Sequence, residues 1–321
     1  MTSRRSVLNL GIATVAAMAG GVFIDRRATA NEMRAEADFP PTGQFLTVDG
    51  ARVHVHVEGT GPDLILIHGA SGNTRDFTYD LVGALAPRYR VIAFDRPGLG
   101  YSDPIGGTGL SPMGQAAHLQ KAAAMLGVTK PLILGQSYGA AVAMAWALSF
   151  PDPAALILVS GATMPWKGRA LGPWYEVAQT GLGGVTAVPL IAAFPPLDFA
   201  RNALNAVAAP ENPPAGYADY IGLPLILRRA STRVNARQVG TLKSHIIDML
   251  PRYPSVTIPV ELLHGTADGI VYASVHSEPL SRLLPDATLT LLDGAGHMAH
   301  HTRLPDVIAA VDRAATRAGL R

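Results

Sequence analysis

A serine between two glycines is the first feature of the sequence that points to chemistry. The segment Gly135-Gln136-Ser137-Tyr138-Gly139 follows the apolar run 132–134 and precedes the small-residue run 140–143. Small residues on both sides of a strand-to-helix turn let it turn tightly and expose the serine hydroxyl above a sheet. The setting therefore predicts that Ser137 lies on a nucleophile elbow rather than in an ordinary loop.

A serine hydroxyl is a poor nucleophile at neutral pH, so Ser137 needs a base, and that base needs an orienting carboxylate. His297 follows the small-residue turn 294–296, which lets its loop approach the serine closely. Asp268 and Asp293 are both candidates for the carboxylate. The other histidines near these positions are expected to be structural or solvated: His264, His276, His300 and His301.

Five segments, in this order, resemble motifs of the α/β-hydrolase superfamily: Ile67-His68-Gly69-Ala70, Asp95-Arg96-Pro97-Gly98-Leu99-Gly100-Tyr101-Ser102, Gly135 to Gly139, Gly265-Thr266-Ala267-Asp268 and Gly294-Ala295-Gly296-His297. The resemblance covers nearly all of residues 44–318. It implies that Ser137 is the nucleophile, that His297 takes its proton and delivers it to the leaving alcohol, and that Asp268, not Asp293, orients the imidazole. Dehalogenase and epoxide hydrolase relatives need a carboxylate at position 137, so those activities are disfavoured.

The resemblance also predicts how a negatively charged tetrahedral intermediate is stabilised. One donor is the backbone N–H of Tyr138, directly after the nucleophile, and the second is the backbone N–H of Ala70 after the third strand. His68 is expected to hold that loop by hydrogen bonds, without a catalytic role.

The elements that must position these residues alternate along the chain. A hairpin is predicted at 44–48 and 52–58, and short apolar runs typical of strands buried on both faces follow at 63–67, 90–94, 131–134, 156–159, 259–263 and 287–292. Helix-length segments lie between most of them: 77–86, 113–126, 140–150, 274–284 and 305–318. The pattern predicts the α/β class, a mostly parallel sheet with helices on both faces.

Two segments stand apart from that alternation. Residues 163–254 contain no clear core strand and are expected to form a helical cap insertion between the core segments 31–162 and 255–321. Residues 1–30 combine Arg4-Arg5, an apolar stretch from Val7 to Ile24 and Ala28-Thr29-Ala30. This layout predicts an export signal resembling a twin-arginine signal, cleaved after Ala30, and hence a periplasmic or secreted enzyme. One alternative is an uncleaved membrane anchor, and only in that case is the protein expected to contact a membrane. The other alternative is a disordered leader.

The composition excludes several classes of function. The 26 Lys and Arg residues nearly balance the 24 Asp and Glu residues without a charged block, so no nucleic-acid partner is expected. The chain has no cysteine, which excludes disulfides and thiolate chemistry. Gly98 and Gly100 do not form a dinucleotide fingerprint, and no cofactor is implied. His54 and His56 share a strand face but lack a third ligand, so a solvated hairpin face is expected there rather than a metal site.

The predicted function is therefore that of a cofactor-free serine hydrolase, a carboxylesterase or lipase-like enzyme whose partner is a small-molecule ester. Apolar residues between Trp166 and Leu225 favour an apolar ester of modest size. Two other reactions use the same fold and triad: hydrolysis of a carbon–carbon bond in a ring-fission diketone, and acyl transfer to a nucleophile other than water. A catalytically inactive binding module is the remaining alternative.

Overall fold

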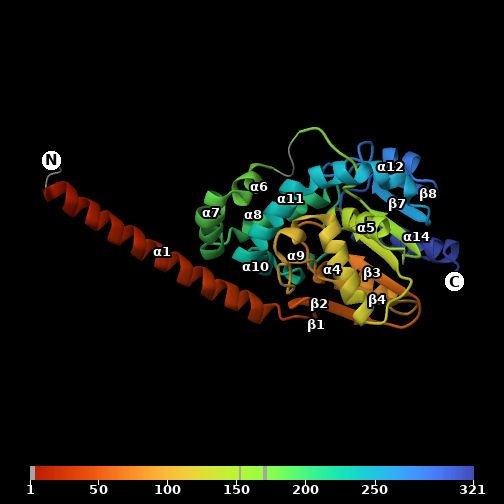
Figure 1. The fold of residues 1–321 in the computed structure, drawn as a ribbon, viewed down its shortest axis with the longest axis horizontal. Helices are drawn as coiled ribbons and strands as arrows, with labels where there is room; N and C mark the ends of the chain where they lie inside the picture. The colour runs from red at the N-terminus through yellow and green to blue at the C-terminus, as the bar shows by residue number, and fades with distance from the viewer. Residues whose placement is uncertain (1–3, 152, 169–171) are drawn as a thin grey trace.

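The computed structural model describes residues 4–151, 153–168 and 172–321, so residues 1–3 of the expected leader and 169–171 of the expected cap lie outside the described residues (Figure 1). Its centre is an eight-stranded sheet with the order β1-β2-β4-β3-β5-β6-β7-β8. The strands are β1 (Gln44–Val48), β2 (Ala51–Glu58), β3 (Asp63–Ile67), β4 (Arg90–Phe94), β5 (Leu132–Gln136), β6 (Ala155–Val159), β7 (Val260–Gly265) and β8 (Ala287–Leu292).

The sheet is parallel from β4 to β8, whereas β2 pairs antiparallel with both β1 and β4. Every residue of β5 and β6 is buried, as expected for strands covered on both faces. The predicted α/β fold class is therefore confirmed. Because β3 to β8 run in one direction, their carboxyl ends share one edge, and the loops that carry the candidate residues start there.

Helices cover both faces of the sheet. Residues of α4 (Pro112–Met125), α5 (Tyr138–Ser149) and α12 (Ser277–Leu283) belong to one hydrophobic cluster. Residues of α2 (Arg75–Thr78), α3 (Leu81–Leu85), α13 (Ala299–Thr302) and α14 (Leu304–Arg317) belong to the cluster on the other face. The prediction of one helix over 77–86 is wrong, because the chain breaks at Tyr79 and Asp80, where the Asp80 carboxylate turns to His301 Nδ1 at 2.8 Å.

The described residues between 163 and 254 form helices joined by irregular segments and contain no strand (Figure 1). The helices are α6 (Gly172–Gln179), α7 (Gly181–Ala193), α8 (Leu197–Ala208), α9 (Tyr217–Tyr220), α10 (Leu223–Ile226) and α11 (Arg229–Met249), followed by the 3₁₀ helix η2 (Leu250–Ser255). A second 3₁₀ helix, η1 (Gly106–Leu110), precedes α4 and packs against α11. We refer to α6 to α11 as the cap.

A single helix, α1 (Arg4–Asp38), contains nearly all of the expected leader and continues through Ala30 without a break (Figure 1). Its second half packs against the cap: Arg27 Nε donates to Ala193 O at 2.8 Å, and Asn31 Nδ2 donates to Ala192 O at 2.9 Å. Within the described part of the chain, no individual helix has the length and apolarity of a bilayer span. Together α7 and α8, bent by 103°, meet that criterion by length and composition alone.

Candidate active site

Ser137 lies in a strained turn between β5 and α5. Its backbone has φ +52° and ψ −115°, a conformation that costs energy for a residue with a side chain. Gly135 and Gly139 make the turn possible. A Cβ on Gly135 would lie 2.4 Å from Gly139 O, and one on Gly139 would lie 2.0 Å from Ile67 O. The two glycines therefore permit the close backbone packing that projects the Ser137 hydroxyl above the sheet.

The structure brings Ser137, His297 and Asp268 together from three loops, with Ser137 more than a hundred residues before the other two. His297 Nε2 lies 3.0 Å from Ser137 Oγ, and His297 Nδ1 lies 2.8 Å from Asp268 Oδ2. Asp268 follows β7 and His297 follows β8. The two loops touch at Gly265, where a Cβ would lie 2.1 Å from Ala295 O. The distance between His297 and Ser137 suits proton transfer from the serine, and the distance between His297 and Asp268 suits orientation of the base.

Asp268 is buried and held by several donors. Its Oδ1 accepts from the N–H groups of Ile270 and Val271, both at 2.9 Å, and His264 Nε2 lies 3.2 Å from Oδ2. Burial by itself raises the pKa of this carboxyl, but the hydrogen bonds with His264 and His297 outweigh that effect and hold the pKa well below its ordinary value. Asp268 is therefore a carboxylate across the neutral range.

The alternative acid, Asp293, lies elsewhere. Its side chain is exposed at the end of β8, and its Oδ1 accepts from Thr266 Oγ1 at 3.4 Å. Asp268, and not Asp293, contacts the His297 imidazole.

The loop after β3 lies directly against the elbow. A Cβ on Gly69 would come within 3.1 Å of Ser137 Cβ, so the next peptide group, at Ala70, borders the serine. The buried Arg96 guanidinium donates to Gly69 O and to His68 O, each at 2.9 Å. In a trans peptide the N–H points opposite to the preceding carbonyl, so fixing Gly69 O on Arg96 turns the Ala70 N–H away from Arg96. This orientation supports Ala70 as an oxyanion donor beside Tyr138.

Arg96 is a functional residue that no sequence pattern pointed to. Its side chain is fully buried, donates to Gln115 Oε1 and Gln238 Oε1, and stacks on the Tyr138 ring at 4.1 Å. Burial lowers the pKa of Arg96 to about 10, so it stays charged at neutral pH. The available signal was a charged residue two positions after the end of an apolar strand, since such a residue is rarely buried without a specific partner.

His68 holds the same loop, as expected. Its Nε2 accepts from Arg96 N–H at 3.0 Å, and burial lowers the pKa of His68 to about 4, which keeps the ring neutral. The expectation of a solvated face for His54 is wrong. The His54 side chain is buried, with Nδ1 2.7 Å from Asp95 Oδ2 and Nε2 accepting from Gly43 N–H at 3.0 Å.

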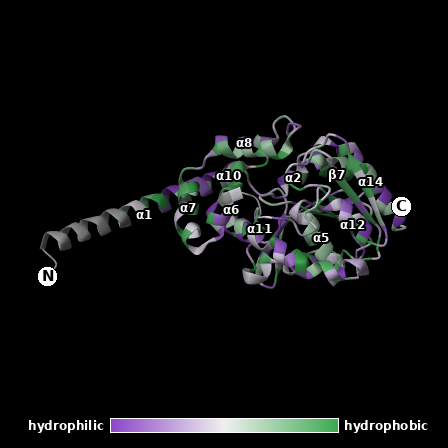
Figure 2. Ribbon diagram, turned by 90° about the horizontal axis from the view of Figure 1, so that it is seen from above, coloured by the Kyte–Doolittle hydropathy of each residue, from purple (hydrophilic) through white to green (hydrophobic). Residues whose placement is uncertain are grey.

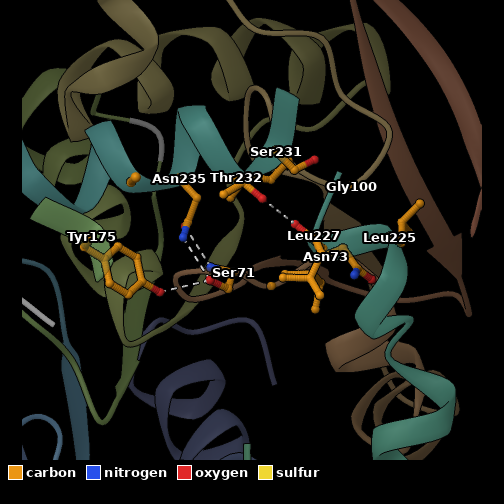
Figure 3. Close-up of a pocket in the computed structure, with 13 residues that line it drawn as sticks. Ser71, Asn73, Gly100, Tyr175, Leu225, Leu227, Ser231, Thr232 and Asn235 are labelled. Atoms are coloured by element: carbon orange, nitrogen blue, oxygen red, sulfur yellow. Dashed lines mark hydrogen bonds between the residues drawn. The ribbon is translucent and has the colours of Figure 1, made fainter. Parts of the chain in front are cut away.

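Cap residues reach the same loop through Ser71, which follows Ala70 and has φ +56°. The Ser71 N–H donates to Asn235 Oδ1 at 2.8 Å, and Asn235 Nδ2 donates to Ser71 Oγ at 2.8 Å. Ser71 Oγ also lies 3.1 Å from the Tyr175 hydroxyl (Figure 3). Asn235 on α11 and Tyr175 on α6 therefore anchor the candidate oxyanion loop, a role that the sequence analysis missed because nothing in its patterns pairs residues 71 and 235.

A cavity of about 50 Å³ adjoins this anchor, between the core loops and the cap (Figure 3). Its lining combines hydroxyl and amide groups of Ser71, Ser231, Thr232 and Asn235 with the apolar Leu99, Leu225 and Leu227. Ser137 and His297 do not line it. A space of this size holds one or two water molecules, far less than the several hundred cubic ångströms of a typical ligand pocket.

One other cluster has the residue types of a metal site: Asp76, His300 and His301, whose nearest donor atoms lie within 4.8 Å of one another. The atoms that could bind a metal instead form hydrogen bonds with one another: His300 Nε2 and His301 Nε2 lie 3.1 and 3.2 Å from Asp76 Oδ1. The Tyr217 hydroxyl on α9 donates to the same oxygen at 2.5 Å. We therefore assign this cluster to the connection between core and cap, and His300 and His301 are structural, as expected.

The sequence matches the family model described as the alpha/beta hydrolase fold over residues 62–304. The chain belongs to the α/β-hydrolase family. Among curated proteins, it is 32% identical over 297 residues to polyketide synthase ThaQ of Burkholderia thailandensis, covering 89% of this chain and 13% of that protein. It is 30% identical to the uncharacterized protein Rv2715 of Mycobacterium tuberculosis, covering 88% of this chain and 87% of that protein. Haloalkane dehalogenase 2 of the same organism is 26% identical, covering 85% and 94%.

Solved structures share the α/β-hydrolase fold. Esterase RhEst1 from Rhodococcus sp. ECU1013 superposes with a TM-score of 0.64 at 25% identity, covering 84% of this chain and 97% of that one. A meta-cleavage product hydrolase from Pseudomonas fluorescens superposes with a TM-score of 0.66 at 20% identity, covering 86% and 98%. The chain is thus an α/β-hydrolase-fold protein, with relatives that catalyse several hydrolytic reactions.

Proposed function

We propose that the protein is a serine hydrolase that cleaves apolar carboxylic esters through an acyl-enzyme intermediate. The observation that carries the proposal is the continuous hydrogen-bonded line from Ser137 Oγ through His297 to Asp268 Oδ2. A nucleophile, a base and an orienting carboxylate in that geometry are the requirements for acyl transfer by serine.

In the first half of the reaction, Ser137 Oγ bonds to the ester carbonyl carbon while its proton passes to His297 Nε2. The carbonyl electron pair moves onto oxygen, where the N–H groups of Ala70 and Tyr138 stabilise the charge. When the carbonyl re-forms, the bond to the alkoxy oxygen breaks, and that oxygen takes the proton from His297. The alcohol leaves and Ser137 carries the acyl group.

In the second half, water gives a proton to His297 Nε2 as its oxygen attacks the acyl carbon. The second tetrahedral intermediate uses the same two N–H donors. Its collapse returns the proton to Ser137 Oγ and releases the carboxylic acid. Asp268 stays ionised throughout and stabilises the imidazolium, consistent with its lowered pKa.

The similarity to esterase RhEst1 supports ester hydrolysis as the reaction. The relationship to haloalkane dehalogenase 2 does not carry over its reaction, because dehalogenation by this fold needs a carboxylate nucleophile where Ser137 stands. Carbon–carbon hydrolysis and acyl transfer to another nucleophile remain alternatives on the same triad, and the substrate test below separates them.

The test is turnover of p-nitrophenyl esters from acetyl to palmitoyl by wild type and Ser137→Ala. We expect hydrolysis by wild type and a loss in kcat of at least about 10⁴-fold in the variant. No turnover at any chain length would refute the esterase assignment. Cleavage of a vinylogous diketone in its place would favour the carbon–carbon hydrolase, and product partition to added alcohol or peroxide would favour the acyltransferase.

We also propose that the enzyme acts outside the cytoplasm, with its N-terminal segment as export signal or anchor. The paired Arg4-Arg5 and the uncharged stretch from Val7 to Ile24 support this location. Mass spectrometry of the N-terminus of protein isolated from its host would reveal whether the chain begins at Asn31, as cleavage after Ala30 requires.

A further inference from the structure

Exposed apolar side chains are concentrated in two segments of the described structure. Of its sixteen exposed large hydrophobic residues, four lie on α1 and seven lie between Val177 and Phe199. The eleven residues are Met18, Val22, Phe23, Met33, Val177, Leu182, Val185, Leu190, Phe194, Leu197 and Phe199. Leu182 on α7 is 75% exposed and Phe199 on α8 is 71% exposed, so these side chains project into the surroundings. We call these eleven residues the apolar surface.

Six of the seven cap residues of the apolar surface lie in an uncharged segment, whereas Phe199 follows the exposed Asp198, and the Arg27 guanidinium lies 4.7 Å from the Phe194 ring. Between Glu176 and Asp198 the sequence contains no Asp, Glu, Lys, Arg or His. Helix α7 is apolar on its buried side, at Val188 and Ala192, and its exposed side carries Leu182, Val185 and Leu190 with Thr186 as its one hydroxyl. A helix that is hydrophobic all round normally lies inside a protein or in contact with lipid. The exposed side of α7 is covered by no described part of this chain.

Helix α1 joins its own exposed residues to those of the cap. Ile24 and Ala28 pack on Ala192 and Ala193, and Arg229 from α11 pairs with Glu32 at 2.7 Å. Met18, Val22 and Phe23 lie on α1 within the two helical turns before this contact. From there α1 runs out beyond the body of the molecule (Figure 1), while the hydropathy colouring places apolar residues on α7 beside it (Figure 2). The sequence from Met18 back to Val7 contains no charged residue.

From these observations we propose that the apolar surface docks on a lipid bilayer. A bilayer accepts apolar side chains from several helices without a matching shape, and an apolar N-terminal helix that leaves the body beside the cap would enter the same membrane. The exposed Arg26 lies one helical turn after Phe23, where a cation would meet anionic headgroups. A second copy of the chain is the other possible occupant and is an outcome of the test.

The surface also suggests where the substrate comes from, an extension that rests on the proposed function. Seven of the eleven residues of the apolar surface belong to the cap, and cap residues Asn235 and Tyr175 hold the Ser71 loop beside Ser137. Docking would therefore bring the active site close to esters dissolved in the bilayer. The bilayer contact itself requires no activity of Ser137.

The binding test uses flotation of the full-length protein with vesicles of phosphatidylcholine and phosphatidylglycerol in equal parts. The triple variant Leu182→Asp, Val185→Asp, Phe199→Asp should bind at least about tenfold more weakly than wild type, because three exposed apolar contacts become charged. The matched control Met125→Asp, Ile247→Asp, Tyr272→Asp changes side chains that are 57%, 49% and 58% exposed outside the apolar surface, and it should bind as wild type does.

Circular dichroism and hydrolysis of a soluble acetyl ester establish that both triple variants are folded and active. We call the Leu182→Asp, Val185→Asp, Phe199→Asp protein the cap variant. With ester embedded in the vesicles, its hydrolysis rate should fall at least about fivefold, and the rate of the control should not. Equal vesicle binding by wild type and the cap variant would overturn the proposal. So would light scattering that shows a dimer dissociated by the cap variant, combined with no vesicle binding by wild type. If no ester is hydrolysed but the binding difference persists, the proposed function fails and the docking stands.

Discussion

The candidate active site and the apolar surface differ in the interactions that their side chains make. At the site, the polar groups of Ser137, Asp268, His297 and Arg96 have specific partners at 2.8 to 3.0 Å, and glycines let the backbones approach closely. On the apolar surface, large apolar side chains such as Leu182 and Phe199 remain 75% and 71% exposed in the described structure. The site is defined by geometry, and the surface by composition.

Substitutions are therefore expected to have effects of different size in the two regions. At the site, exchange of one atom breaks a hydrogen bond whose partner is buried, so the effect is large and local. On the surface, each side chain contributes a similar increment of apolar area, so effects are small and cumulative. The Ser71 anchor lies between the two regions, because cap residues there hold a loop of the core.

The largest expected effect separates two aspartates of similar sequence context. Asp268→Asn should reduce kcat for a soluble ester by about 10⁴-fold, because the amide favours the wrong imidazole tautomer and cannot stabilise the imidazolium. Asp293→Asn is the matched control and should remain within about threefold of wild type. Steady-state kinetics of both variants decide the matter. If Asp293→Asn carried the larger loss, the assignment of the acid would be wrong.

A smaller effect is expected from pH, through a buried histidine next to the acid loop. His276 Nδ1 accepts from the N–H groups of Thr163 and Met164 at 3.2 and 3.1 Å, and burial lowers the pKa of His276 to about 4. The unfolded chain, with an ordinary histidine pKa near 6.5, binds a proton first as pH falls. The stability from neutral His276 is therefore fully present above about pH 6.5 and declines toward pH 4.

Replacing this histidine should remove its share of the acid sensitivity. His276→Gln keeps an acceptor for the two N–H groups but does not titrate. Urea unfolding at pH 7 and at about pH 4.5 should show that the fall in unfolding free energy is smaller in the variant by about 2 kcal/mol. His68, whose pKa is also lowered to about 4, should still destabilise both proteins at acid pH. If the unfolding free energy fell equally in wild type and variant, the lowered pKa of His276 would be wrong.

The smallest effect tests the anchor between cap and core. Asn235→Ala removes the acceptor of the Ser71 N–H and loosens the loop that carries Ala70, so kcat should fall about tenfold with little change in KM. Asn205→Ala, at an exposed position of α8, is the control and should behave as wild type. A rise in KM at constant kcat would assign Asn235 to substrate binding. Unchanged kinetics would separate the cap from the oxyanion loop altogether.

Much of the fold follows from local patterns. All eight predicted strands are present within about two residues of their expected bounds. The central strands β3 to β7 are buried on both faces and leave continuous apolar runs in the sequence, whereas β1 and β2 leave a hairpin pattern. The helix expected over 77–86 fails at Tyr79 and Asp80, since apolar spacing does not register that Asp80 binds His301. The error at His54 has the same origin, because its partner Asp95 lies 41 residues further along the chain.

Local sequence patterns predict the order of the elements, the tight turn at Ser137 and the three residues of the proposed triad, because each leaves a signature within a few neighbouring residues. The packed structure is needed to see that Arg96 fixes Gly69 O, that Asn235 holds Ser71, and that the apolar residues of α1 and α7 share one region of the surface. The two kinds of feature differ in the range of the interactions behind them. Backbone propensities and apolar periodicity act over a few residues, whereas hydrogen bonds between buried groups and the exposure of a surface exist only after distant segments pack together.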